Sequence, residues 1–188
     1  MCLRMNIQQG VRMDSLGLIE PILRAMQKKG IETSTPVQAG CIPPMMEGKD
    51  VIAKAPTGTG KTFAFGLPIL QHIDTAEEAV QAVILAPTRE LALQTTSELR
   101  DAACFMEGIR IVCVYGGDSI NKQIEQLKRR PQIVVATPGR LGDHIKRRTV
   151  RVDKVKTVIL DEADRMLDMG FIKDVTHLLD LMKNRKNL

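Results

Sequence analysis

The sequence predicts an α/β protein with three layers, in which a parallel β-sheet carries helices on both faces. From Asp50 onward, short runs of Val, Ile and Leu alternate with amphipathic segments. Strands that are buried on both faces of a parallel sheet have continuous apolar sequences, and strands that alternate with helices are typical of such sheets. The chain has 188 residues, of which 44% are hydrophobic, so it is long enough to bury one sizeable core.

The apolar runs and the segments between them define the expected elements. We expect strands at Val51–Ala53, Val80–Leu85, Ile109–Tyr115, Ile133–Ala136 and Val155–Leu160. The intervening segments have apolar residues at helical spacing. We expect helices at Lys61–Ile73, Arg89–Phe105, Ile120–Arg129, Arg140–Arg147 and from Ile172 towards Leu188, where the sequence becomes polar and basic.

Two more helical segments precede Asp50. The first is Leu18–Lys28, where Pro21 is tolerated in a first turn and Gly30 provides a stop. The second runs from Pro36 to about Ile42, because two consecutive prolines follow. We therefore divide the chain into a leader at 1–12, a helical region at 13–49 and an α/β region at 50–188, the last two forming one structural domain.

The composition excludes several classes of protein. The four cysteines form no C-x-x-C pair, and the histidines lie at no metal-ligand spacing from them, so neither a zinc site nor a disulfide framework is indicated. No apolar run approaches the roughly 20 residues that span a membrane. The first residues also lack the apolar core of a signal peptide. We expect a soluble, cytoplasmic protein that is a monomer.

Charge and aromatic content limit how the chain could contact a nucleic acid. The net charge of +5 permits a polyanionic partner, and it equally suits a solvated surface of mixed charge. The chain has no Trp, one Tyr and four Phe, too few for a platform on which bases stack. Any contact with nucleic acid would therefore be made to its backbone.

The segment Ala55-Pro56-Thr57-Gly58-Thr59-Gly60-Lys61-Thr62 is typical of a phosphate-binding loop. Gly58 and Gly60 allow the backbone to turn so that successive N–H groups converge on phosphate oxygens. Lys61 would contact the β- and γ-phosphates, and the Thr62 hydroxyl would bind Mg²⁺. A glycine-rich turn with an incidental lysine is the alternative, but the expected strand before the segment and helix after it favour the phosphate loop.

An acidic cluster follows the last expected strand, at Asp161-Glu162-Ala163-Asp164. Side chains at the carboxyl end of such a strand lie beside the crevice in which parallel sheets bind ligands. We expect Asp161 to hold Mg²⁺ through water and Glu162 to orient and deprotonate the attacking water. An acidic cluster of this kind is also common at a helix N-terminus, but the phosphate loop in the same chain favours the metal site.

Together these motifs resemble the first RecA-like domain of the DEAD-box RNA helicases, a P-loop NTPase fold. The resemblance extends from about Met13 to Asp180, and its motifs occur in the family's order. They are Gly30–Gln38 (Q motif), Ala55–Thr62 (motif I), Pro87–Ala92 (motif Ia), Gly116-Gly117, Thr137-Pro138-Gly139-Arg140, and the tetrad Asp161–Asp164 that names the family.

The resemblance implies the ligands and the role of each residue. Gln38 would read the edge of adenine, so the nucleotide would be ATP, bound with Mg²⁺ by the loop at 55–62. Lys61, Asp161 and Glu162 would be catalytic, and Asp164 would link the nucleotide site to contacts between domains. RNA phosphates and riboses would be contacted by Pro87, Thr88, Arg89, Gly116, Gly117, Thr137, Pro138, Gly139 and Arg140.

Plainer interpretations of the RNA-contacting residues stay open at this stage. Arg89 and Glu90 could be surface residues at the start of a helix. The Thr137–Gly139 segment could be an ordinary turn in which Thr137 caps the next helix. The basic clusters at 128–130 and 146–148 are interpreted as solvated faces and are not assigned to the site.

The chain departs from the family pattern at three points. Met13 stands where the family usually has Phe, and Ser34 stands where it has Pro; Met can still pack on an adenine face. The sequence also ends at Leu188, before the family's Ser-Ala-Thr motif and second RecA-like domain. We therefore expect a fragment that hydrolyses ATP very slowly, because the arginine finger of a second domain contributes about 10³–10⁵ in rate.

Three functions fit these observations to different degrees. The first is an ATP-dependent RNA helicase of which this chain is the nucleotide-binding half. The second is a module without enzymatic activity that clamps RNA or binds protein. The third, an ATPase acting on DNA or protein, leaves Gln38 and the Thr137–Arg140 turn unexplained.

Overall fold

The computed structural model describes residues 10–186, so most of the leader expected at 1–12 lies outside the described residues. The chain divides into two compact units. Among the described residues, the first unit comprises 10–73 and 98–107, and the second comprises 74–97 and 108–186. Each unit is described by itself below.

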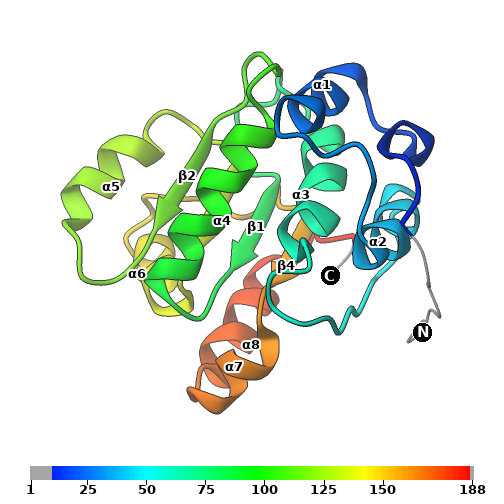
Figure 1. Ribbon diagram of the computed structural model, residues 1–188. Coiled ribbons are helices and arrows are strands. Elements are labelled where there is room, and N and C mark those ends of the chain that lie inside the picture. Colours follow the sequence, from blue (N-terminus) through cyan, green and yellow to red (C-terminus); the bar gives the residue numbers. More distant parts are fainter. Residues whose placement is uncertain (1–9, 187–188) are drawn as a thin grey trace. The chain divides into compact units, whose positions relative to one another are not determined.

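The second unit contains a parallel sheet of four strands, in the order β2-β3-β1-β4 (Figure 1). The register is regular, because Ala82 at the start of β1 pairs with Ile133 of β3 and with Thr157 of β4. The strands are β1 (Ala82–Leu85), β2 (Ile111–Val114), β3 (Ile133–Ala136) and β4 (Thr157–Leu160). These confirm four of the expected strands: β3 has the expected bounds, and the other three are shorter than expected.

The fifth expected strand, Val51–Ala53, was wrong. This segment has no regular secondary structure, and the Ile52 side chain is 75% exposed. A strand requires a neighbour that satisfies its N–H and C=O groups. Within the described part of the first unit, the only β-pairing is a single bridge between Arg12 and Thr33. An apolar sequence alone therefore did not produce a strand here.

One face of the sheet packs against helices through an aliphatic core. Val83, Leu85 and Val134 point to this face, because alternate residues of a strand face the same side. Leu141 and Leu178 fill the core from the covering helices. The helices that contribute to this core are α5 (Ile120–Leu127), α6 (Pro138–Lys146), α7 (Ala163–Asp168) and α8 (Ile172–Leu181).

Helix α4 (Arg89–Ala102) covers the other face of the sheet (Figure 1). It begins in the second unit, and its last turn from Glu98 belongs to the first. Ile84 and Val135, which alternate with the residues of the aliphatic core, are fully buried as well. The second unit is thus the expected parallel sheet with helices on both faces.

The first unit is helical in its described part. Its elements are η1 (Met13–Leu16), α1 (Glu20–Lys28), α2 (Pro36–Met46) and α3 (Lys61–His72). Helix α2 packs along α3. It does not stop near Ile42 as expected but continues through Pro43 and Pro44. Buried Ile42 and Met45 outweigh the helix hydrogen bonds that the prolines cannot make.

The structure has no helix among residues 10–186 that is long and apolar enough to cross a membrane.

Two glycines inside helices have opposite surroundings. A Cβ on Gly66 of α3 would come within 2.5 Å of Cδ2 of Leu99, which is fully buried. A Cβ on Gly142 of α6 would meet nothing within 4 Å. Gly66 therefore gives Leu99 the space it occupies, whereas Gly142 serves no visible packing role.

We predict that Gly66→Ala and Gly142→Ala shift stability in opposite directions. Overpacking against Leu99 costs about 1–3 kcal/mol, while alanine gains about 1 kcal/mol over glycine within a helix. Urea denaturation should show a lower free energy of unfolding for Gly66→Ala and a higher one for Gly142→Ala. Equal stabilisation of both variants would show that Leu99 moves aside without cost.

Candidate functional site

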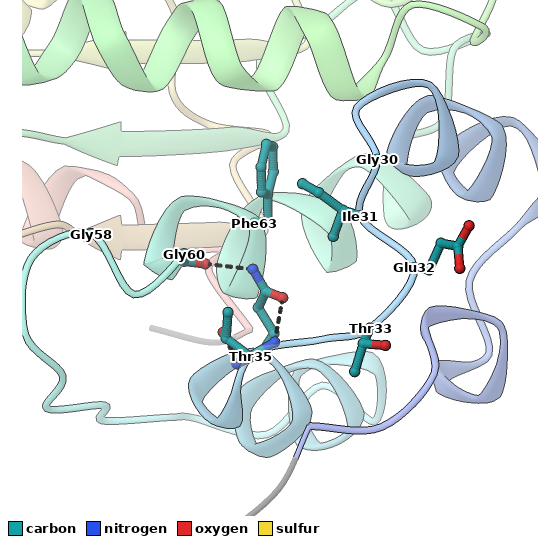
Figure 2. Close-up of a pocket in the computed structure, with 9 residues that line it drawn as sticks. Gly30, Ile31, Glu32, Thr33, Thr35, Gly58, Gly60 and Phe63 are labelled. Carbon is teal, nitrogen blue, oxygen red and sulfur yellow. Dashed lines mark hydrogen bonds between the residues drawn. The ribbon is translucent and has the colours of Figure 1, made fainter.

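A pocket of about 480 Å³ opens in the first unit beside the phosphate loop (Figure 2). One wall is the segment between α1 and α2, and the other is formed by the loop and the start of α3. Its lining residues are Gly30, Ile31, Glu32, Thr33, Thr35, Gln38, Gly58, Gly60 and Phe63. The expected Q motif and motif I therefore line one pocket.

The Gln38 side chain bridges the two walls of this pocket. Its Oε1 atom accepts a hydrogen bond from the Thr35 backbone N–H at 2.9 Å, while Thr35 Oγ1 accepts one from Gln38 N at 3.4 Å. This reciprocal pair is a capping box at the start of α2. The Gln38 Nε2 atom donates to the Gly60 carbonyl at 3.1 Å, a bond drawn in Figure 2. One buried amide thus fixes α2 to the phosphate loop.

The phosphate loop turns through residues 55–60 and leads directly into α3. Gly58 and Gly60 both have φ of 81°, a conformation that side chains disfavour. Gly60 has a second constraint, because a Cβ there would collide with the Gln38 amide. Lys61 Nζ donates to the Ala55 carbonyl at 2.9 Å, and Thr59 Oγ1 donates to the Pro56 carbonyl at 2.7 Å. The loop's lysine therefore bonds to the loop itself.

The two departures in the first unit have structural explanations. Met13 is 3% exposed and is absent from the pocket lining among the described residues, so the expectation that it packs on adenine has no support. The Ser34 hydroxyl donates to the Val11 carbonyl at 2.9 Å and accepts from the Val11 N–H at 3.0 Å. Proline at position 34 could make neither bond.

In the second unit, the remaining site residues follow the four strands in turn. The three expected RNA-contacting segments come after β1, β2 and β3, and the acidic tetrad comes after β4. Thr137 N donates to the Val114 carbonyl at 3.1 Å, and Asp161 N donates to the Leu85 carbonyl at 2.9 Å. These bonds extend the parallel pairing past the strand ends, so all four segments begin at the same edge of the sheet.

The acidic tetrad has an unusual backbone. Glu162 has φ of 51°, a left-handed conformation that non-glycine residues rarely adopt outside turns and functional sites. Its carboxylate lies 3.2 Å from NH1 of Arg165, one turn later in α7. Asp164 Oδ1 accepts from the Arg165 N–H at 2.9 Å, and Asp161 is 7% exposed. The sharp turn thus lies between the end of β4 and the start of α7.

The residues expected to contact RNA differ in the contacts they make within the protein. Thr88 Oγ1 accepts from the Leu91 N–H at 3.3 Å and so caps α4. The Thr137 hydroxyl makes no capping bond to α6, which removes the main reason to interpret it as a simple helix cap. The Arg89 guanidinium lies 4.9 Å above the Tyr115 ring. Gly117 has φ of 82°, with open space where a side chain would stand.

The family of the chain follows from comparison with known proteins. A family model described as "DEAD/DEAH box helicase" matches residues 35–188, which is most of the chain. The chain belongs to the DEAD/DEAH box helicase family.

Family members similar to this chain share half of its sequence. An ATP-dependent RNA helicase CshA of Limosilactobacillus reuteri is 50% identical over 169 residues, covering 90% of this chain and 34% of that protein. A DEAD-box ATP-dependent RNA helicase CshA of Bacillus cereus is 51% identical over 164 residues, covering 87% and 31%. The chain therefore spans about a third of the length of these relatives.

Two solved structures have a similar fold. A DEAD box protein from Methanococcus jannaschii is 40% identical with a TM-score of 0.89, covering 95% of this chain and 49% of that one. A hypothetical ATP-dependent RNA helicase from Sulfolobus tokodaii is 40% identical with a TM-score of 0.81, covering 89% and 48%. The sheet is thus that of a DEAD-box RecA-like domain.

The sequence did not predict a cluster of buried polar side chains that lies beside the DEAD-box motifs. Gln123 of α5 is 2% exposed, and His144 of α6 is fully buried. His144 Nε2 lies 3.0 Å from Gln123 Oε1, and His144 Nδ1 lies 2.8 Å from Thr149 Oγ1. The only signal in the sequence was a polar residue four positions before Leu127 on the inner face of an amphipathic helix.

Burial, and after it the positive charge of Arg140, lowers the pKa of His144 below its ordinary value of 6.5; Arg147 acts in the same direction and Asp143 opposes them. The pKa of a second group in this region, Asp118, is also shifted. The hydrogen bond from the Ser119 backbone N–H lowers the pKa of Asp118, which also accepts a bond from the Tyr115 hydroxyl. His144 is therefore neutral and Asp118 ionised near neutral pH.

We predict that this protein loses stability as the pH falls below about 6.5, partly through His144. The unfolded chain takes up a proton on this residue at a higher pH than the folded protein does. Protonation therefore favours unfolding from about pH 6.5 down to the lowered pKa of the folded state. Urea denaturation between about pH 7.5 and pH 5 should show a smaller loss for His144→Gln, which cannot titrate.

His177→Gln is the matched control, because His177 is exposed on α8. It should reproduce the pH dependence of the unmodified protein. The same dependence in His144→Gln would contradict the assignment to His144.

Proposed function

We propose that this chain is the nucleotide-binding, N-terminal RecA-like domain of an ATP-dependent RNA helicase, which binds Mg-ATP or ADP and the backbone of single-stranded RNA. One observation carries the proposal most strongly. In a DEAD-box fold, three segments rich in phosphate-binding groups and the acidic tetrad begin at one edge of a parallel sheet. Ligands bind at this edge in open α/β sheets.

The nucleotide would occupy the pocket beside the phosphate loop. Residues 55–62 would surround the phosphates, with Lys61 exchanging its bond to the Ala55 carbonyl for phosphate oxygens. The Gln38 amide has a donor and an acceptor side by side, which match N7 and the N6 amino group of adenine. Gln38 would release the Gly60 carbonyl to make this contact.

A magnesium ion would accompany ATP. Mg²⁺ prefers oxygen ligands, keeps several of its waters and binds largely through phosphates. The Thr62 hydroxyl and the Asp161 carboxylate would each offer the ion an oxygen of this kind. When bound, it would neutralise charge that develops on the phosphates.

Hydrolysis would depend on Glu162 as the general base. A carboxylate can orient a water molecule and accept its proton, while Lys61 and Asp161 stabilise the transferred phosphate directly and through the metal. Arg165 holds the Glu162 carboxylate at 3.2 Å, which fixes its direction on an otherwise exposed turn. Asp164 would connect this site to a second RecA-like domain.

RNA would be held through its phosphates and riboses, without reading its sequence. Arg89 and Arg140 would supply charge, Thr88 and Thr137 hydroxyls, and Gly116 and Gly117 backbone N–H groups. Pro87, Pro138 and Gly139 would shape these segments so that the strand can approach. Such contacts require no aromatic platform, in keeping with the composition.

Turnover and unwinding would require more than this chain. The two CshA relatives, both named as ATP-dependent RNA helicases, are about three times longer. The resemblance assigns the arginine fingers to a second RecA-like domain, so this chain alone would bind nucleotide and hydrolyse it slowly. We further propose that it acts as a monomer in the cytoplasm, with domain limits at residues 13 and 50.

A clamp or protein-binding platform without enzymatic activity is the second candidate. Exposed Leu167, Met169 and Ile172 around α7 would suit a protein partner.

ATPase assays on this chain, alone and joined to a second RecA-like domain, distinguish the helicase proposal from this second candidate. The helicase proposal expects almost no turnover alone and strong RNA stimulation of the joined form; robust turnover by the chain alone and independent of RNA would overturn it.

We predict that Gln38→Glu weakens binding of adenine nucleotides. The carboxylate still accepts from the Thr35 N–H, so α2 remains capped, but it cannot donate to adenine N7. A lost bidentate contact costs about 1–3 kcal/mol, so ADP affinity should fall roughly 10- to 100-fold. Titration with fluorescent ADP measures this, and the preference for ADP over GDP should fall with it.

Gln71→Glu is the matched control for this change. Gln71 lies in the same unit and also bonds two backbone groups, the Ile19 N–H and the Gly17 carbonyl, each at 2.9 Å. It is not among the residues that line the pocket. Equal losses of ADP affinity in both variants would attribute the effect to stability and not to adenine recognition.

We predict that Glu162→Gln abolishes turnover while it preserves ATP binding. In a protein that joins this chain to a second RecA-like domain, the rate should fall about 10²- to 10⁴-fold, because general-base catalysis contributes that much. Asp168→Asn, an equal loss of charge at an exposed position on α7, should retain normal turnover. Hydrolysis that persists in Glu162→Gln would remove this residue from the base role.

A further inference from the structure

The buried Gln123 amide contacts three separate backbone or side-chain groups. Its Nε2 atom donates to the Tyr115 carbonyl at 2.9 Å. Its Oε1 atom lies 3.2 Å from NH1 of Arg140 and 3.0 Å from Nε2 of His144. A residue of α5 is thus bonded both to the segment after β2 and to the helix after β3.

These bonds fix the orientation of every group involved. A carbonyl only accepts, so the nitrogen of the Gln123 amide must face Tyr115, and its oxygen must face Arg140 and His144. In its neutral form, His144 therefore carries its proton on Nε2 and donates to Gln123. Its Nδ1 then faces the Thr149 hydroxyl, whose single hydrogen is shared between Nδ1 and the His144 carbonyl, 3.0 Å from the hydroxyl oxygen. The Tyr115 carbonyl and the Arg140 N–H thus leave the Gln123 amide one favourable orientation, and neutral His144 adds a second donor to its oxygen.

Arg140 is held by one end of its guanidinium. NH1 donates to Gln123 Oε1 at 3.2 Å and to the Asp118 carbonyl at 3.1 Å, which uses both of its hydrogens. Nε and NH2 carry the other three donors. No hydrogen bond of these two atoms is found among residues 10–186, and the side chain is only half-buried. Its outer edge has the paired donors that bind a phosphate in bidentate fashion.

The same group sets the loop that contains Gly116 and Gly117. The carbonyls of Tyr115 and Asp118, on either side of the glycines, accept from Gln123 and Arg140. The Tyr115 hydroxyl bonds Asp118 Oδ2 at 3.3 Å, which closes the loop. The Tyr115 ring in turn lies beneath the Arg89 guanidinium. All three expected RNA-contacting segments therefore connect to Gln123 directly or through one residue.

We propose that Gln123 is a positioning residue for RNA binding, which holds Arg140 and the Gly116–Gly117 loop in their binding arrangement, with His144 fixing its amide. This inference rests on the proposed function. Without Gln123, the Arg140 side chain would regain its rotational freedom, and RNA would have to order it on binding. Gln123 itself is buried and need not touch RNA.

A double-mutant cycle between Gln123→Met and Arg140→Ala tests the inference, since methionine keeps the length and the helix propensity of glutamine. Affinity is measured by fluorescence anisotropy with a labelled single-stranded oligonucleotide, at several salt concentrations. Each single variant should bind about 10-fold more weakly, as expected for one lost charge-assisted bond. The double variant should bind no more weakly than Arg140→Ala alone.

The salt dependence gives a readout that general destabilisation would not change. Loss of one phosphate contact lowers the slope of log K against log salt by about 0.7 for single strands. Gln123→Met should show this decrease although it removes no charge. Gln126→Met, at an exposed position of the same helix, should keep the original affinity and slope. ADP affinity should be unchanged in all variants.

The outcomes separate this inference from the proposed function. If Arg140→Ala weakens binding but Gln123→Met does not, or the two losses add, the positioning role is overturned and RNA binding by Arg140 stands. If Arg140→Ala and Arg89→Ala both leave RNA affinity unchanged, the proposed function itself fails. If Gln123→Met does not fold, His144→Phe replaces it. That variant removes the hydrogen bond to the Gln123 amide while phenylalanine fills the space of the histidine ring. Its loss of RNA affinity should be smaller than that of Gln123→Met, and it should disappear when Arg140→Ala is also present. A loss that persists in the Arg140→Ala background overturns the inference.

Discussion

The parallel pairing of four strands is the constraint on which the second unit depends. Because β2, β3, β1 and β4 run in one direction and in register, the segments that follow them must begin at one edge of the sheet. Motifs that are separated by up to 70 residues in the sequence thus become neighbours without any direct attraction. The aliphatic core enforces this arrangement, since a strand shifted by one residue would turn Val83 and Leu85 away from the helices.

In each unit, the side chain of a buried glutamine forms hydrogen bonds that connect two neighbouring segments. Gln38 bonds the start of α2 and the phosphate loop, and Gln123 bonds the loop after β2 and α6. An amide suits this role because it offers a donor and an acceptor while it remains neutral. A buried carboxylate or ammonium would cost far more to remove from water. In each case the amide donates to a backbone carbonyl outside its own helix, that of Gly60 or that of Tyr115.

The sequence predicted the parts of the fold that depend on a local residue pattern. It missed those that depend on contacts with residues distant in the sequence. Four strands followed from apolar runs, and the phosphate loop and tetrad followed from residue types at fixed spacing. Val51–Ala53 was wrong because a strand also needs a neighbour, which an apolar run does not reveal. Helix α2 passed Pro43 because burial of Ile42 and Met45 outweighed local propensity. Gln123 and His144 were missed because they lie 21 positions apart, and nothing local pairs them.

Glu162 has a strained backbone conformation, which its proposed chemical role would explain. Its left-handed conformation costs about 1–2 kcal/mol for a residue with a Cβ, and glycine would avoid that cost. Gly58, Gly60 and Gly117 adopt similar conformations without strain, because glycine has no Cβ. In the proposed mechanism, these positions contribute only backbone N–H groups. In the proposed mechanism, position 162 supplies a carboxylate, which glycine could not do. Under that proposal, the strain at Glu162 is the energetic cost of placing a proton acceptor on a sharp turn, with the Asp161 N–H bonded to β1 on one side and the first turn of α7 on the other.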